Sequence, residues 1–154
     1  MISIRKALAN DAPAIWFLRR SAIYKGCIGF YPDDTLKTWA DAPPTEKFQR
    51  NIESDCYLAM IDGRIAGFGI LDLDSGHVGA MFVDPVHMGQ GVGKQILGYL
   101  EDLARAAGLK QLHLDSSLNA VPVYRVCGFI GEQSAKYQSP TGVTLDCVKM
   151  QKPL

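Results

Sequence analysis

The sequence predicts an α/β protein built on a mixed β-sheet, and two observations lead to this prediction. Short apolar runs with strand-like alternation recur along the chain, whereas residues 92–107 carry apolar side chains at helical spacing. Strand-length and helix-length segments also alternate, which favours helices packed on one sheet over separate helical and β regions. The 154 residues can bury a substantial core, so we expect 1–154 to be a single domain.

The first third of the chain predicts one strand followed by helices. Residues 2–6 alternate between apolar and polar side chains, as a strand does. The Asn-Asp pair at 10–11, with proline two residues later, is a helix-start signal. The segment 24–41 is rich in aromatic residues and turn formers, with a short helix predicted over 34–40. A further helix is predicted over 45–52.

The middle of the chain predicts three consecutive strands. A strand over 56–61 is followed by an Asp-Gly pair, which favours a two-residue hairpin turn, and by a returning strand over 65–73. A second turn at 74–76 leads to a strand over 77–83.

The last third predicts two helices and three strands. The helix over 92–107 is followed by glycine in the position of a C-terminal cap. A short strand at 112–114 precedes a second helix over 117–127. Two strands, one starting at Phe129 and one over 143–150, then form a final hairpin.

Composition argues against several classes of partner. Sixteen basic and sixteen acidic residues cancel without any block of like charge, so nothing indicates a nucleic-acid or membrane surface. The amino terminus lacks the pattern of a signal peptide, and no apolar run approaches the ~20 residues that span a bilayer. The four cysteines and three histidines have no metal-ligand spacing, and His87 and His113 are expected at the surface. We therefore expect a reduced, cytoplasmic protein without a metal.

The most informative motif is a glycine-rich loop, Gly89-Gln90-Gly91-Val92-Gly93-Lys94, at the start of the helix over 92–107. Glycines permit positive φ and close approach, and the free amides at a helix start attract anions. The loop therefore predicts a phosphate site, with a merely structural turn as the alternative. A nucleotide-binding P-loop is disfavoured by Met88 and Gln95, and the dinucleotide fingerprint by Lys94.

Residues 83–94 resemble the acetyl-CoA loop of the GNAT superfamily of N-acetyltransferases, which reads [QR]-x-x-G-x-[GA] after a strand ending in V-x-P. Gly91 and Gly93 match this pattern, whereas Met88 stands where Arg or Gln is usual. Residues 112–129 resemble a second GNAT motif, in which a strand leads to N-A-x-x-x-Y and then to G-F. The matching residues are Asn119, Ala120, Tyr124, Gly128 and Phe129. Two motifs in the right order make a chance match far less probable than one.

The resemblance implies the GNAT (acyl-CoA N-acyltransferase) fold, a mixed β-sheet with splayed central parallel strands flanked by helices. It implies transfer of an acetyl group from acetyl-CoA to a primary amine of a small molecule or peptide. A strand would pair its backbone with the pantetheine arm, and the glycine loop would hold the pyrophosphate. The implied cofactor-binding residues are Met81, Phe82, Val83, Met88, Gly89, Gly91, Val92, Gly93, Lys94, Asn119 and Tyr124.

Three features of that implied site stay open. Met88 in place of Arg or Gln suggests weaker coenzyme A binding. Asn119 either contacts the pantetheine or caps the helix that follows it. The resemblance also implies a homodimer, because family members are often dimers.

Acetyl transfer needs a base for the amine, a donor for the oxyanion and an acid for the thiolate. Tyr124 is the expected acid, since a phenol with a pKa near ~10 can donate to a thiolate; the alternative is a core tyrosine. His77 is the expected base, because it falls where several family members carry a catalytic Glu and is largely neutral at pH 7. Asp72, Asp74, a water chain or a merely exposed His77 are the alternatives, and an amide near Phe82 is the expected oxyanion donor.

The acceptor amine is not identified by the sequence. Tyr24, Phe30, Tyr31 and Trp39 either line its pocket or form an aromatic core patch. The second hypothesis for function is a non-catalytic CoA-binding regulatory or interaction domain. Met88 favours that hypothesis, whereas Tyr124 favours the enzyme.

Overall fold

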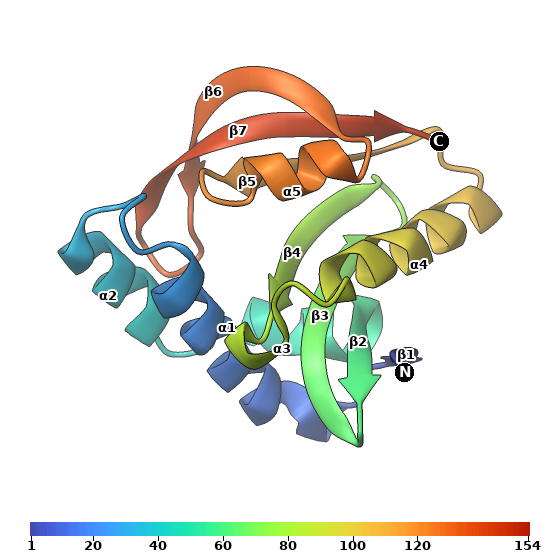
Figure 1. Ribbon diagram of the computed structural model, residues 1–154, viewed down its shortest axis with the longest axis horizontal. Coiled ribbons are helices and arrows are strands. Elements are labelled where there is room, and N and C mark those ends of the chain that lie inside the picture. The colour runs from blue at the N-terminus through green and yellow to red at the C-terminus, as the bar shows by residue number, and fades with distance from the viewer.

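The structure is a computed structural model that describes residues 1–154. Seven strands form one mixed sheet in the order β1-β2-β3-β4-β5-β7-β6 (Figure 1). The strands are β1 (Ser3–Lys6), β2 (Cys56–Ile61), β3 (Arg64–Asp72), β4 (His77–Val83), β5 (Gln111–Ser117), β6 (Ile130–Gln138) and β7 (Thr144–Pro153). The helices are α1 (Ala12–Gly26), α2 (Asp33–Asp41), α3 (Glu46–Asp55), α4 (Val92–Ala106) and α5 (Val121–Val126), with short 3-10 turns η1 (Ala9–Asp11) and η2 (Pro85–His87). The predicted α/β class and order of elements are confirmed.

The central parallel strands, β4 and β5, touch at one end only. His77 and His113 form their single register pair, whereas the other neighbouring strands pair antiparallel over most of their length. The Gly76 carbonyl accepts a hydrogen bond of 3.0 Å from the His113 amide at this junction. Beyond it the strands diverge, and Figure 1 shows β4 and β5 separating into two halves of the sheet. The splayed central strands implied by the sequence are confirmed.

Helix α4 packs closely on one face of the sheet because β3 carries glycines beneath it. A Cβ atom added to Gly67 would lie 2.9 Å from Ile96 Cδ1, and one added to Gly69 would lie 2.8 Å from Ile96 Cγ2. A Cβ added to Gly93, at the start of α4, would lie 3.5 Å from the Met81 methyl group. These close contacts hold the amino end of α4 against the carboxyl end of β4.

Helices α1 and α3 cover the opposite face of the same half-sheet. Ile15 and Leu18 of α1 pack there with Ile52 of α3 and Phe68 of β3. Thr45 caps α3, since its hydroxyl accepts a hydrogen bond of 3.1 Å from the Phe48 amide. The sheet thus separates α4 from α1 and α3, and each face has its own core cluster.

Two boundaries differ from the sequence prediction. The predicted helix over 117–127 begins only at Val121, because Ser117 is still paired in β5, opposite Cys147. Strand β3 ends at Asp72 rather than at residue 73, and Asp74 lies in the turn that follows. No helix has the length and apolarity to cross a lipid bilayer.

Candidate active site

The glycine loop presents a row of free main-chain amides at the start of α4. Gly89 has φ 79° and Gly91, the N-cap residue, has φ 81°, both in the left-handed region that favours glycine. The amides of residues 89–94 donate to no protein acceptor, whereas the next amide, of Gln95, bonds the Gly91 carbonyl at 3.1 Å. Free amides and the positive end of the α4 dipole therefore converge on the loop, as an anion site requires.

The edge of β4 that faces β5 has unpaired main-chain groups. Asp84 donates its amide to the Ala66 carbonyl at 2.8 Å, so by strand alternation the main chain of Phe82 also points toward β3. The main-chain groups of Met81 and Val83 point the other way, toward the gap left by β5. These two residues, rather than Phe82, can pair with an extended molecule in that gap.

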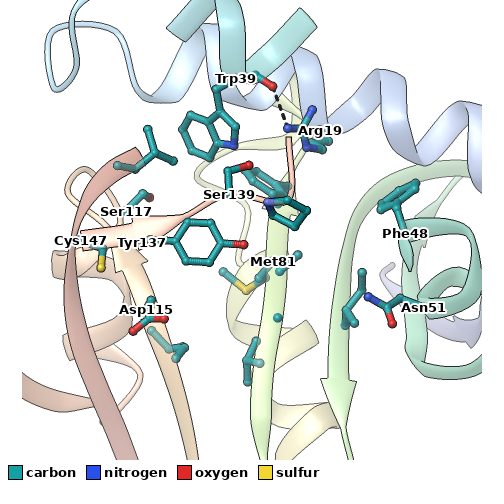
Figure 2. Close-up of a pocket in the computed structure, with 18 of the residues that line it drawn as sticks. Arg19, Trp39, Phe48, Asn51, Met81, Asp115, Ser117, Tyr137, Ser139 and Cys147 are labelled. Atoms are coloured by element: carbon teal, nitrogen blue, oxygen red, sulfur yellow. Dashed lines mark hydrogen bonds between the residues drawn. The ribbon is translucent and has the colours of Figure 1, made fainter. Parts of the chain in front are cut away.

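A cavity of about 340 Å³ lies on the face of the sheet covered by α1, α2 and α3. Residues of those helices line it, among them Trp16, Arg19, Trp39 and Phe48. Figure 2 shows Tyr137 of β6 extending across the cavity toward β4, with Arg19 and Trp39 at one end and Asp115 at the other. Ala120 and Tyr124 also line it, so the cavity reaches through the gap between β4 and β5 to the start of α5.

Tyr124 belongs both to the core and to the wall of this cavity. Its side chain is 6% exposed, and its ring meets the Phe129 ring edge-on at 5.5 Å between centroids. The hydroxyl bonds no other protein group, and burial raises the pKa of the phenol, which therefore stays protonated at neutral pH. The two alternatives for Tyr124, core residue and hydrogen donor, are thus compatible.

His77 lies in the cavity wall at the closed end of the splay. Its ring lies 5.0 Å from the His113 ring between centroids, and the His113 Nε2 lies 3.2 Å from the Ser75 carbonyl oxygen. Burial, followed by the neighbouring His113, lowers the pKa of His77, so its imidazole is neutral at pH 7. His113, expected at the surface, is half-buried, and it forms the one register pair between β4 and β5.

Asp72, an alternative base, also lines the cavity, beside His77. Hydrogen bonds of 2.9 Å from the Asp74 amide and the Ser75 hydroxyl lower the pKa of its carboxyl. A carboxylate held in this way is a weak base. Asp74 does not line the cavity.

Asn119 connects the β5–α5 turn to the end of α1. Its Oδ1 accepts a hydrogen bond of 3.2 Å from the Cys27 thiol. The helix-cap alternative for Asn119 was wrong, because Ala120 is the N-cap of α5 and no side chain caps that helix. The helix begins one residue later than a cap by Asn119 would require.

The aromatic residues expected at the acceptor pocket divide into two groups. Tyr31 and Trp39 line the cavity, whereas Tyr24 and Phe30 do not. The Tyr31 hydroxyl donates to the Asp146 carbonyl at 2.7 Å and accepts from the Leu118 amide at 3.0 Å. Tyr31 thereby connects β7 with the β5–α5 turn and is both a core and a wall residue.

One of the four cysteines of the chain, Cys147, lines the cavity. All four cysteines are free thiols, and burial raises the pKa of Cys27 to about 11. Burial likewise raises the pKa of Cys127. No group of three or more His, Cys, Asp or Glu side chains is placed to hold a metal ion.

Comparison with known proteins accords with this geometry. The family model of the acetyltransferase (GNAT) domain matches residues 25–153, most of the chain. The chain belongs to the GNAT acetyltransferase family. A crystal structure of a GCN5-related N-acetyltransferase from Rhodopseudomonas palustris superimposes with a TM-score of 0.90 and 26% identity, covering 99% of this chain and 95% of that one.

Other proteins match the chain at lower identity or over less of its length. The PaiA N-acetyltransferase of Thermoplasma acidophilum, solved with coenzyme A, has a TM-score of 0.78 at 19% identity, covering 100% of this chain and 99% of that one. An IAA acetyltransferase of Azospirillum brasilense is 33% identical over 104 residues, 63% of this chain and 66% of that protein. A glucosamine 6-phosphate N-acetyltransferase of Trypanosoma brucei brucei is 37% identical over 54 residues, 35% of this chain and 37% of that protein.

Several residues of this GNAT cavity were missed by the sequence analysis, among them Arg19 and Tyr137. Arg19 lies one helical turn after Ile15, on the buried face of α1, so a charged residue at a core position was the available signal. Nothing in the sequence indicates that Tyr137 lines the cavity, because its place there depends on how the β6–β7 hairpin packs against α1.

Proposed function

We propose that the chain, as a single domain over 1–154, transfers an acetyl group from acetyl-CoA to a primary amine of a small molecule or peptide. The observation that carries the proposal is the path that β4 offers to an extended molecule. The free amides of residues 89–94 follow its carboxyl end, its edge toward β5 is open, and its Met81 and Phe82 line the cavity that Tyr124 and His77 also line. The coenzyme A in the solved PaiA structure supports the choice of cosubstrate.

The path suits the parts of acetyl-CoA in order. The amides of residues 89–94 hold the pyrophosphate by hydrogen bonds that need no particular side chain, so Met88 in the usual Arg or Gln position is tolerated. Met81 and Val83 hydrogen-bond the amide groups of the pantetheine arm along the open edge of β4. The acetyl thioester then lies in the gap between β4 and β5.

Transfer proceeds by direct attack of the amine nitrogen on the thioester carbonyl. The new C–N bond forms, His77 accepts a proton from the nitrogen directly or through water, and a gap-facing amide of β4 stabilises the oxyanion. When the C–S bond breaks, the Tyr124 hydroxyl donates to the sulfur. Burial raises the pKa of Tyr124, so the phenol keeps its proton at neutral pH and can donate it to the sulfur.

The acidic side of the pH profile tests His77. Protonated His77 cannot accept a proton, so the kcat/KM of the wild type should fall as pH drops through the His77 pKa, which lies below the ordinary 6.5. We expect His77→Gln to lose about tenfold in kcat/KM at pH 7.5 and to lack this acidic limb. The measurement is kcat/KM from pH 5 to pH 9.

His113→Gln is the matched control for His77→Gln, because it removes the partner imidazole and retains the base. It should keep an acidic limb, moved to higher pH, since the neighbouring His113 contributes to lowering the pKa of His77. A limb that persists unchanged in His77→Gln would assign the base to another group.

The activity itself is tested by thiol release from acetyl-CoA over a panel of primary amines, with mass spectrometry of the acetylated product. We expect turnover with at least one amine and none with acetyl-CoA alone. Binding of coenzyme A without turnover of any amine would instead favour a non-catalytic CoA-binding domain.

A further inference from the structure

Arg19 is a buried cation in the wall of the acceptor cavity. It belongs to α1, its residue is 7% exposed, and the guanidinium lies 4.0 Å from the centroid of the Trp16 ring. Its Nη2 donates to the Trp39 carbonyl at 2.8 Å and its Nη1 to the Ala40 carbonyl at 3.4 Å. Figure 2 shows the guanidinium beside Trp39 at one end of the cavity.

No carboxylate of the chain neutralises this charge. The ion-paired arginines are Arg5, Arg20 and Arg105, and each of them has a partly exposed side chain, unlike Arg19. Burial lowers the pKa of Arg19 to about 10, which still leaves it protonated at neutral pH. A buried charge without a counterion is costly, and the carbonyls at the end of α2 offset that cost only in part.

Four carboxylates, of Asp55, Asp72, Asp115 and Asp146, also line the cavity, and none of them pairs with Arg19. Asp115 forms an ion pair of 3.2 Å with Lys149, and Asp146 pairs with Lys136. The carboxylate of Asp72 accepts hydrogen bonds from the Asp74 amide and the Ser75 hydroxyl in the turn that follows it. The positive charge of Arg19 is therefore available to a molecule that enters the cavity.

The hydrogen-bond geometry of Arg19 favours a planar anion. A guanidinium has five N–H donors, and the two carbonyl bonds leave the others free to form the two parallel bonds that a carboxylate accepts. The same two bonds fix the side chain in place, so little rotamer freedom remains to be lost on binding. Tyr137 extends across the cavity between this end and β4 (Figure 2).

We propose that the acceptor is an amino acid, whose carboxylate Arg19 binds at the α1–α2 end of the cavity while its amine reaches the gap between β4 and β5. This inference rests on the proposed acetyl transfer and names its substrate class. The aromatic rings of Trp16 and Phe48, 4.6 Å apart between centroids, supply an apolar wall beside Arg19 for the acceptor's side chain.

The test compares L-amino acids with their carboxamides, which keep the amine and lose the carboxylate charge. In the wild type we expect kcat/KM for the best amino acid to exceed that for its amide by at least about tenfold, the effect of one charge-assisted pair. Arg19→Gln should bring this ratio close to one by slowing only the acid, and Arg19→Lys should retain part of it. Arg20→Gln is the matched control, because the neighbouring arginine pairs with Asp41 outside the cavity and should leave the ratio unchanged.

The outcomes separate the two proposals. A wild-type ratio near one, with amides turned over normally, would overturn the carboxylate proposal and leave acetyl transfer standing; this measurement needs no variant. An equal loss of kcat/KM for the amino acid and its amide in Arg19→Gln would show that Arg19 only holds α1 and α2 together. That result would also overturn the carboxylate proposal. Failure of every amine to react would overturn the proposed function and the substrate class together.

Discussion

Tyr124→Phe is expected to slow acetyl transfer by about 10²- to 10⁴-fold, the usual contribution of a positioned acid. The loss should appear in kcat, while the Kd for acetyl-CoA stays within about threefold of the wild type, because the hydroxyl contacts the sulfur mainly as negative charge develops there. The measurement is steady-state thiol release combined with calorimetric binding of coenzyme A.

This variant isolates the hydroxyl because the structure gives it no other role. Phenylalanine keeps the ring that meets Phe129 at 5.5 Å and the volume that fills the core. The hydroxyl bonds no protein group, so its removal leaves no buried partner unsatisfied. We therefore expect the free energy of unfolding to change by less than about 1 kcal/mol.

Tyr99→Phe is the matched control for Tyr124→Phe. Tyr99 lies on α4, half-buried against the Tyr57 ring and outside the cavity. Loss of its hydroxyl should change neither kcat nor the Kd for acetyl-CoA. If Tyr124→Phe turned over as fast as the wild type, Tyr124 would be a core residue only, and the thiolate would need another donor.

The fold was predictable because its local signals agree with one another. Thr45 starts a helix as a cap, the Asp-Gly pair at 62–63 makes the predicted hairpin, and glycine at 108 ends α4. Each of these signals acts within a few residues, and the tertiary packing does not override it. The splay was predictable only through the resemblance, because it depends on where two strands far apart in the chain stop pairing.

The cavity was less predictable, because its residues come together only in the folded chain. Arg19 stands at a core position of α1, but its place in the cavity depends on α2, which brings the Trp39 and Ala40 carbonyls against it. His113 was assigned to the surface because nothing local reveals that it is the register partner of His77. Asn119 carried a capping signal, but its side chain bonds Cys27, 92 positions away, and α5 starts without a side-chain cap.

Gly91→Val is expected to raise the Kd for coenzyme A by about 10- to 100-fold. Gly91 has φ 81°, which a β-branched residue adopts only at a high cost, so the chain should turn the amides of residues 89–94 away from their common focus. The matched control is Gly63→Val, since Gly63 has φ 75° and, like Gly91, nothing within 4 Å of an added Cβ, but lies in the β2–β3 turn. Both variants should lose similar stability in urea unfolding, and only Gly91→Val should lose affinity. Pantetheine, which lacks the diphosphate, should bind Gly91→Val and the wild type alike; an equal loss for both ligands would show that the loop does not hold the diphosphate.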